Sequence, residues 1–193
     1  MHRDLIDLLA CPACPGDKPL RLEITEEAAG DVVTGTLNCE ACKQSYSIEK
    51  SIPRFVQPEQ DYCGNFGFQW QQWRTLQIDR LSGHSLSEQR MLSDSRWPRD
   101  WFSGKLILDA GCGAGRFADV AATLGARVVA VDISTAIDAC RETTFVHDSD
   151  PNAGRVFGIQ ASLFDLPLRN GVFDAVYCMG VIQHTPDPTA LMG

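Results

Sequence analysis

The sequence predicts an α/β protein in which a doubly wound parallel sheet follows a small β module. Two observations support this fold class. Just past the middle of the chain, a short apolar segment runs into the glycine-rich loop "GCGAG", a helical pattern and a second apolar segment. Near the N-terminus, two CxxC pairs lie among short segments of alternating apolar and polar residues. With 193 residues, of which 44% are hydrophobic and 22% charged, the chain is globular and has room for one ordinary domain plus a small module.

The first predicted unit spans residues 1–55 and contains Cys11 and Cys14 in "CPAC" and Cys39 and Cys42 in "CEAC". Each pair places two thiols on one tight turn, and two such turns can surround one zinc ion tetrahedrally at about 2.3 Å. The flanking segments "LRLEI", "TGTLNC" and "SYSIEK" alternate as strands do, so the turns are expected at hairpin ends. Four thiolates leave no open coordination position, so we expect a structural zinc that supplies folding energy to a small unit.

Two other interpretations of the paired cysteines are a redox dithiol and a disulfide. A reducing compartment disfavours both, and the chain has no signal peptide pattern, so we expect a cytoplasmic protein. The remaining cysteines give no spacing signal; they are Cys63, Cys112, Cys140 and Cys178.

Through "LLACPAC" and "CKQSYSIEKSIPRF", the first unit resembles the zinc-ribbon proteins that accompany or precede methyltransferase domains. In that family the second cysteine pair is followed by Tyr-Pro-Ile and Gly-Ile-Pro. Ser47 and Ser51 replace the proline and the glycine here. These departures leave the ribbon intact and give no support to a particular partner surface.

The second predicted unit, residues 56–104, is a connector that holds all four tryptophans of the chain. Phe66, Trp70 and Trp73 recur at helical spacing, which predicts an amphipathic helix that buries an aromatic stripe. The alternative is that this helix roofs the pocket beside the glycine-rich loop and excludes water from it. Pro98 then marks the approach to the next unit.

The third predicted unit, residues 105–193, begins with strand, glycine loop, helix and strand. We expect the first strand at Leu106–Leu108, the helix from about Gly115 to Leu124, and the second strand at "RVVAVD". The first is apolar and the second has an apolar centre, as strands buried on both faces of a parallel sheet do.

The glycine positions bear on which cofactor this loop binds. A dinucleotide fingerprint needs GxGxxG, and Arg116 occupies the place of the third glycine. Asp109 at the strand tip would repel a pyrophosphate but can help to hold the ammonium group of S-adenosylmethionine, whose carboxylate can sit at the helix N-terminus. Asp132, 21 residues beyond Gly111, can accept both ribose hydroxyls, a feature that dinucleotide enzymes share.

Residues 100–193 resemble the class I S-adenosylmethionine-dependent methyltransferases, through "LDAGCGAG", "AVDIS" and "FDAVYCMGVIQHTPDP". The resemblance implies a Rossmann-like sheet and a cofactor site at one edge of it. The resemblance implies that Gly111, Cys112 and Gly113 line the methionine end of the cofactor. Met179 and Gly180 are implied near the sulfonium, and Gly115 is a further expected cofactor-binding residue. The resemblance also implies that Asp132 and Ile133 hold the ribose and flank the adenine.

One position departs from the resembled family. Four residues before Leu-Pro in "QASLFDLPL", the family usually has an acidic residue that receives the adenine amino group, and this chain has Ser162. A serine can still accept a hydrogen bond, without charge assistance, and Leu163 can supply the adjoining backbone amide. We therefore expect weaker adenine recognition.

Methyl transfer from a sulfonium is a direct displacement, so the protein mainly aligns the reactants and excludes water. A hydroxyl or protonated amine acceptor benefits from a general base, and His184 in "VIQHTPDP" follows the fourth predicted strand, where the acceptor should enter. The alternative role of His184 is to cap the following loop.

The sheet is expected to be incomplete, with strands 1–4 of the resembled fold. Its fourth strand, "VFDAVYCM", is apolar on both faces as a central strand is, yet only "VIQHTPDPTALMG" follows. We expect either a truncated form of a longer protein, cut inside a helix that starts near Pro188, or a second chain that completes the sheet.

The leading hypothesis is methyl transfer to a small-molecule acceptor. The net charge of −8 argues against a nucleic acid held by charge, and no apolar run is long enough for a membrane span. The second hypothesis is a non-catalytic scaffold whose ribbon docks a protein partner. A nicotinamide- or flavin-dependent oxidoreductase is third and is disfavoured by Arg116.

Overall fold

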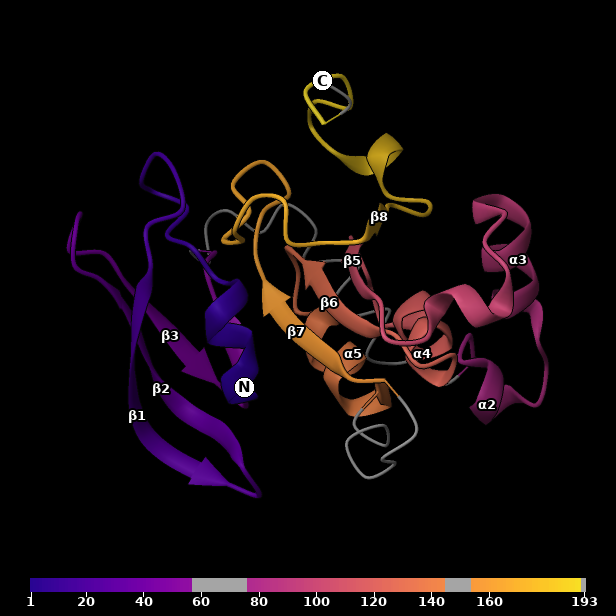
Figure 1. The fold of residues 1–193 in the computed structure, drawn as a ribbon, viewed down its shortest axis with the longest axis horizontal. Helices are drawn as coiled ribbons and strands as arrows, with labels where there is room; N and C mark the ends of the chain where they lie inside the picture. Colours follow the sequence, from indigo (N-terminus) through magenta and orange to yellow (C-terminus); the bar gives the residue numbers. More distant parts are fainter. Residues whose placement is uncertain (57–75, 145–153, 192–193) are drawn as a thin grey trace.

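The computed structural model describes residues 1–56, 76–144 and 154–191. Its strands form one eight-stranded sheet in the order β1-β2-β3-β4-β7-β6-β5-β8 (Figure 1). The first four strands are antiparallel to their sequence neighbours, and β4, β7, β6, β5 and β8 run parallel to one another. The ribbon and the α/β part therefore share a single sheet. The predicted division into residues 1–55, 56–104 and 105–193 stays a prediction.

The N-terminal part is a three-stranded antiparallel ribbon (β1–β3) with a short helix before it and one short strand after it. The elements are the 3-10 helix η1 (Arg3–Leu8), β1 (Leu20–Ala28), β2 (Asp31–Cys39), β3 (Ser45–Glu49) and β4 (Ile52–Arg54). The three segments whose alternation predicted strands all lie in β1, β2 and β3. The turn of Cys39 and Cys42 joins β2 to β3, at a hairpin end as expected. The turn of Cys11 and Cys14 lies instead between η1 and β1.

Numbered in chain order, the four strands of the parallel part lie side by side as 3-2-1-4, the order found in a doubly wound sheet. Its strands are β7 (Val156–Gln160), β6 (Arg127–Asp132), β5 (Leu106–Ala110) and β8 (Ala175–Tyr177). The prediction for β6 matches its bounds, and β5 extends two residues beyond Leu108. In Figure 1 the carboxyl ends of β6 and β7 point toward the C-terminal segment.

Helices cover one face of the parallel strands. α4 (Arg116–Thr123) and α5 (Ala136–Thr144) contact the strands, with the 3-10 helix η3 (Arg99–Phe102) on the same face. α3 (Leu86–Ser95) packs on α4, and α2 (Asp79–Ser82) packs on α3. The 3-10 helix η5 (Ile182–His184) lies in the C-terminal segment. On the helix-covered face Phe102 is fully buried, and Trp97 and Trp101 stack with ring centroids 4.4 Å apart. The predicted helix over Phe66, Trp70 and Trp73, and Cys63, lie outside the described residues.

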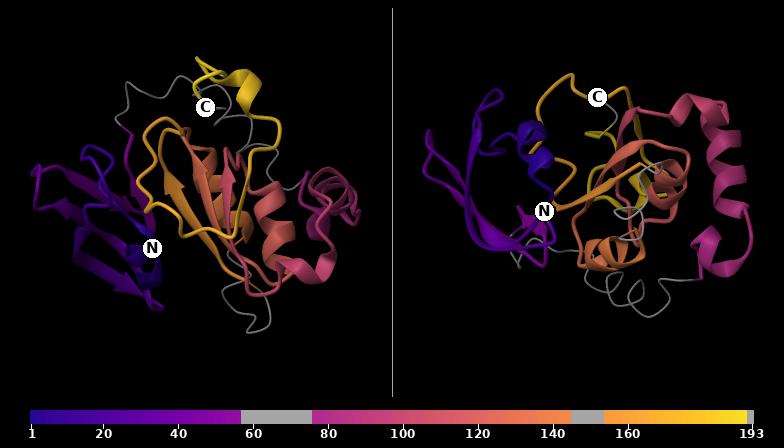
Figure 2. Two further views of the ribbon diagram at one scale, coloured as in Figure 1. Left: turned by 45° about the horizontal axis from the view of Figure 1, so that its top comes forward. Right: turned by 60° about the horizontal axis from the view of Figure 1, so that its bottom comes forward.

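The ribbon and η1 cover the other face, where a doubly wound sheet usually carries more helices. Leu106 and Leu108 of β5 belong to the same buried core as Leu5 of η1 and Leu37 of β2. Figure 2 shows the ribbon and the helices on opposite sides of the parallel strands. Burial on both faces explains why β5 is apolar at every position except Asp109.

The strand pairing that links the two parts of the sheet is short. β4 pairs with β7 at one position, Arg54 beside Gln160, and the Phe55 N–H donates to the Gln160 carbonyl at 2.8 Å. An ion pair of Arg54 with α5 supports the same join. A strand of three residues is too short for its alternation to be recognised, so this join was not predicted.

The other end of the described sheet is β8. Val176 at its centre is 57% exposed, so β8 is an edge strand within the described residues, although its composition suggested a central one. The helix expected near Pro188 is absent from residues 188–191, which form a turn. Along the described residues, no helix has the length and apolar content needed to cross a bilayer.

Candidate functional site

The four paired cysteines converge at one end of the ribbon. Their sulfur atoms all lie within 4.8 Å of one another, with 3.6 Å between Cys11 and Cys42 and 3.8 Å between Cys14 and Cys39. A tetrahedral zinc with bonds of about 2.3 Å places its sulfur ligands roughly 3.8 Å apart. No disulfide joins them. The geometry therefore fits a four-thiolate zinc centre.

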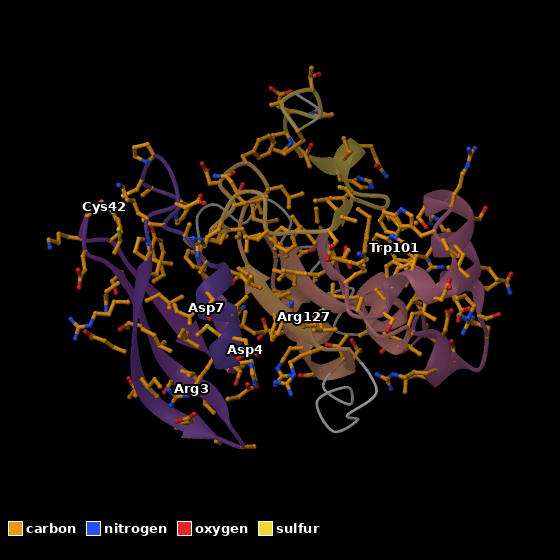
Figure 3. The ribbon with its side chains drawn as sticks, in the orientation of Figure 1. Arg3, Asp4, Asp7, Cys42, Trp101 and Arg127 are labelled. Atoms are coloured by element: carbon orange, nitrogen blue, oxygen red, sulfur yellow. The ribbon has the colours of Figure 1, made fainter. Side chains whose placement is uncertain are left out.

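Local backbone geometry and a tyrosine support this cluster. The backbone N–H groups of Cys42 and Ala41 lower the pKa of the Cys39 thiol to about 6, so one thiolate forms readily. The Tyr46 hydroxyl lies 3.4 Å from the Cys11 sulfur, and its ring packs on Phe55 at 4.6 Å. In Figure 3 Cys42 lies at one end of the ribbon, on the opposite side of the molecule from Trp101.

The glycine loop follows β5 and turns sharply at the carboxyl edge of the sheet. The N–H groups of Gly111 and Cys112 both donate to the Val131 carbonyl, at 2.8 and 3.0 Å. Gly111 has a φ of +84°, and a Cβ there would lie 2.5 Å from both methyl groups of Val181. The first glycine thus admits a side chain from the C-terminal segment, which the sequence alone did not indicate.

Gly115 serves a different contact. It has a φ of +86° at the start of α4, and a Cβ would lie 2.7 Å from the Cys140 sulfur of α5. This glycine lets α4 and α5 approach closely. It does not line the cavity described next.

Two adjoining cavities lie at the carboxyl edge between the glycine loop and the C-terminal segment. The larger has a volume of about 280 Å³ and is lined by Gln77, Arg90, Gly111, Cys112, Gly113, Ala114, Arg116, Phe117, Asp132, Ser134, Met179, Gly180, Val181 and His184. The smaller, of about 60 Å³, is lined by Gly111, Asp132, Ile133, Leu163, Val181, His184 and Thr185. The shared residues separate the two cavities, and together they form the candidate cofactor site.

The structure brings most of the predicted site residues to these cavities. The larger cavity is lined by the predicted Gly111, Cys112, Gly113, Asp132, Met179, Gly180 and His184, and the smaller also by Ile133 and Leu163. Three predicted residues line neither: Asp109, Gly115 and Ser162. The roles of all these residues stay predictions.

Asp132 organises the loop that should hold the ribose. Its Oδ2 accepts from the Gly113 N–H at 2.9 Å, and its Oδ1 accepts from the Ser134 N–H and hydroxyl at 2.9 and 2.7 Å. These three bonds use three of the roughly four acceptor positions of the carboxylate. Asp132 therefore supports the loop as well as facing the site.

Asp109 lies near the end of β5, as expected, but it is buried and lines neither cavity. It is only 2% exposed and shares the helix-covered face with Tyr177, its neighbour on β8. Burial raises the pKa of Asp109 to about 7, Asp132 acts in the same direction, and the nearby Tyr177 hydroxyl opposes the shift. Within the described residues, neither Asp109 Oδ2 nor the Tyr177 hydroxyl makes a hydrogen bond of good distance and angle. The strand alternation turns this side chain away from the cavity.

Ser162 has a local role. Its hydroxyl accepts from the Phe164 N–H at 3.2 Å, which stabilises the turn after β7. Ser162 lines neither cavity, so the structure gives no support to the predicted contact between its hydroxyl and the adenine.

The sequence did not predict that two arginines line the larger cavity. Arg90 comes from α3 and Arg116 from the start of α4, and their guanidinium carbons lie 5.7 and 5.0 Å from the centre of the Phe117 ring. Arg116 Nε also donates to the Ser87 hydroxyl at 2.8 Å. No ion pair of Arg116 occurs among the described residues, and burial lowers its pKa. The positive charge of Arg116 at the N-terminus of α4 is a pattern from which an anionic ligand could have been predicted.

Comparison with known proteins matches both parts of the chain. Residues 108–193 match the model of the methyltransferase domain family, and residues 2–51 match the model of Trm112p-like proteins. The ubiquinone biosynthesis O-methyltransferase of Xanthomonas oryzae pv. oryzae (strain PXO99A) is 35% identical over 91 residues, which are 47% of this chain and 36% of that protein. The protein of the same name from Xanthomonas campestris pv. campestris (strain B100) is 34% identical over 89 residues, 46% and 36% of the two chains. The chain thus spans about 36% of the length of the curated relatives it matches.

Among solved structures, magnesium protoporphyrin IX methyltransferase from Synechocystis PCC 6803 with bound SAH is similar, with a TM-score of 0.48 and 23% identity. The match covers 69% of this chain and 63% of that one. A TehB-like SAM-dependent methyltransferase from Corynebacterium glutamicum ATCC 13032 gives a TM-score of 0.44 at 24% identity, over 64% and 60% of the chains. The predicted recognition and fold class are confirmed. Residues 108–193 are an S-adenosylmethionine-dependent methyltransferase domain, and residues 2–51 are a Trm112p-like module that carries the four-cysteine cluster.

Proposed function

We propose that the protein transfers the methyl group of S-adenosylmethionine to a hydroxyl of a small-molecule acceptor by direct displacement. The observation that carries the proposal is the cavity between the glycine loop, Asp132 and His184 at the carboxyl edge of the parallel strands. Ligands of open α/β sheets bind at this edge. The O-methyltransferases found among the relatives support an oxygen nucleophile, and the net charge of −8 supports a small acceptor rather than a nucleic acid.

The residues present fit the cofactor. The cavities of about 280 and 60 Å³ adjoin, and together they reach the lower end of the size range of small-molecule sites. Asp132 would accept from the ribose hydroxyls, and Ile133 and Leu163 would flank the adenine. Arg90 and Arg116 would hold the methionine carboxylate, and no ion pair occupies Arg116 among the described residues.

When bound, S-adenosylmethionine supplies a methyl group carried by a positively charged sulfonium. Transfer of that methyl group leaves the sulfur as a neutral thioether. The protein aligns the acceptor with that methyl group and excludes water. His184 is our candidate for the base that takes the proton of the acceptor hydroxyl, because it lines both cavities. Its backbone also holds the turn of η5 through a hydrogen bond from its N–H to Val181 O at 2.8 Å, so the side chain has to be tested separately.

We further propose that the four-cysteine cluster holds a structural zinc. The sulfur separations of 3.6 and 3.8 Å support it, and four thiolates leave no position for water or substrate. Inductively coupled plasma mass spectrometry of the purified chain should find one zinc per chain. Metal removal by a chelator should lower the melting temperature, and an unchanged melting temperature would contradict a structural role.

The alternative of a partner-docking scaffold has less support. The ribbon residue Leu37 and the η1 residue Leu5 are buried in a core shared with the methyltransferase strands of the same chain. That apolar face is therefore occupied without a partner. The oxidoreductase hypothesis is not favoured by any contact.

The acceptor proposal is tested with the full chain, S-adenosylmethionine and a panel of hydroxylated aromatic and aliphatic compounds. Mass spectrometry should detect S-adenosylhomocysteine together with a methyl ether. His184→Gln should lower kcat by a factor of about 10²–10⁴, the contribution of one general base. Methylation of nitrogen only, or of a nucleic acid, would contradict the proposed acceptor. A fully active His184→Gln variant would contradict the role of His184 as a base and leave only its alternative role in capping the following loop.

A further inference from the structure

Arg54, the last residue of β4, connects the ribbon side of the sheet to the methyltransferase domain. Its Nη2 and Nη1 donate to the two carboxylate oxygens of Asp138 in α5, at 2.8 and 3.1 Å. Nη1 also donates to Oε1 of Gln160 at the end of β7, at 3.0 Å. The side chains of Arg54 and Asp138 are only 12% and 17% exposed, so these contacts are largely shielded from water.

The contact with Gln160 fixes the orientation of its amide. A guanidinium only donates hydrogen bonds, so the oxygen of the Gln160 amide must face Arg54 and the NH₂ group must face away. On that side Gln160 Nε2 donates to the Ile133 carbonyl at 3.0 Å. A flipped amide would set two donors against each other and leave the Ile133 carbonyl without this bond.

The Ile133 carbonyl belongs to the loop that shapes the cofactor site. Ile133 lines the smaller cavity and directly follows Asp132, the proposed ribose ligand. The Asp132 carbonyl accepts from the Ala161 N–H at 3.0 Å. The carbonyls of Asp132 and Ile133 are therefore both hydrogen-bonded to residues at the end of β7. A change in the Gln160 amide would therefore alter the peptide between the ribose ligand and α5.

We propose that Arg54 is a positioning residue for the adenosine end of the cofactor site, acting through the Gln160 amide on the Ile133 carbonyl. The inference rests on the proposed cofactor site. It goes beyond that site because Arg54 lies outside both matched ranges, residues 2–51 and 108–193. The ribbon side of the sheet thereby contributes to cofactor affinity as well as to stability.

The chain offers a matched control for this contact. Arg141 of α5 pairs with Asp31 of β2 at 2.7 Å, with side chains 16% and 19% exposed, so it joins the same two parts at similar burial. This pair lies with Arg155 and Val156 at the amino end of β7, far along the strand from Gln160. Breaking it should cost stability without touching the cofactor loop.

The test compares S-adenosylhomocysteine affinity by isothermal titration calorimetry in the full chain and three variants. Arg54→Met keeps the aliphatic stem and removes the donors, Gln160→Glu keeps the arginine contact but removes the donor to Ile133, and Asp31→Asn is the control. Arg54→Met and Gln160→Glu should each weaken binding threefold to tenfold, the effect of one hydrogen bond. Asp31→Asn should bind as the wild type does while its melting temperature falls. The double variant with Arg54→Met and Gln160→Glu should bind S-adenosylhomocysteine little more weakly than either single variant, because both substitutions affect the same hydrogen bond to the Ile133 carbonyl.

The outcomes separate this inference from the proposed function. Wild-type binding with unchanged affinity in Arg54→Met or Gln160→Glu would overturn the inference and leave the cofactor site standing. Equal weakening in Asp31→Asn would overturn it too, because the effect would then be general loss of structure. No binding by the wild type would overturn both. Should Arg54→Met fail to fold, Gln160→Glu decides the question.

Discussion

Replacement of Asp109 by asparagine tests whether this carboxyl group is a buried structural acid or a cofactor ligand. Asp109 is 2% exposed between β5, β8 and α4, and burial raises its pKa from 3.8 to about 7. Asparagine has nearly the same shape and no charge. The substitution therefore removes the titration and little of the packing.

The sign of the effect follows from the direction of the shift. Because the pKa is raised in the folded state, the folded protein binds this proton more tightly than the unfolded chain does. The resulting stabilisation is full below pH 3.8 and is lost as the pH rises through about 7. Between pH 5 and pH 8 the wild type should lose about 2–3 kcal/mol of unfolding free energy from this group, at about 1.36 kcal/mol per pH unit until the group ionises.

Urea denaturation of the wild type and Asp109→Asn at pH 5 and pH 8 measures this difference. The variant should gain stability relative to the wild type on going from pH 5 to pH 8, by about the same 2–3 kcal/mol. Its affinity for S-adenosylhomocysteine at pH 8 should stay within about twofold of the wild type, a difference smaller than one hydrogen bond. A constant stability difference at the two pH values, combined with lost affinity, would refute the reasoning and return Asp109 to the cofactor.

Two further predictions concern helix packing and the metal centre. Gly115→Ala should lower the unfolding free energy by about 1–3 kcal/mol in urea denaturation, because its Cβ would lie 2.7 Å from the fully buried Cys140 sulfur. The control Gly171→Ala also has a positive φ but meets nothing within 4 Å, so an equal loss there would show that strain alone acts. Tyr46→Phe should weaken zinc binding about 10- to 100-fold in a chelator competition, because it removes the hydroxyl 3.4 Å from a cluster sulfur. Ser47→Ala removes a neighbouring hydroxyl that bonds elsewhere and should bind zinc normally; equal weakening in both would contradict an outer-shell role.

Local patterns in the sequence predicted the elements whose residues interact with near neighbours along the chain. The alternation of β1 to β3 and the continuous apolar run of β6 identified strands, because each pattern reflects burial of a whole face. The cysteine spacing identified a cluster whose sulfurs do converge. The glycine loop and Asp132 were likewise found together, since both follow strands that end at the same edge of the sheet.

Features that depend on distant segments were not predictable in this way. The pairing of Arg54 with Gln160 joins residues 106 positions apart through a three-residue strand. The sequence also placed Asp109 at the cofactor, because the motif does not specify which face of β5 each residue occupies. Arg90 enters the cavity from α3, a helix whose position only the tertiary structure gives.

Isothermal titration calorimetry of the chain with S-adenosylhomocysteine, with NAD alongside, tests the central claim most directly. The account predicts that the wild type binds S-adenosylhomocysteine and not NAD, and that Asp132→Ala loses this binding because it removes the ribose acceptor and the anchor of the Gly113 N–H. Binding of NAD instead, binding of neither ligand, or unchanged affinity in Asp132→Ala would contradict it.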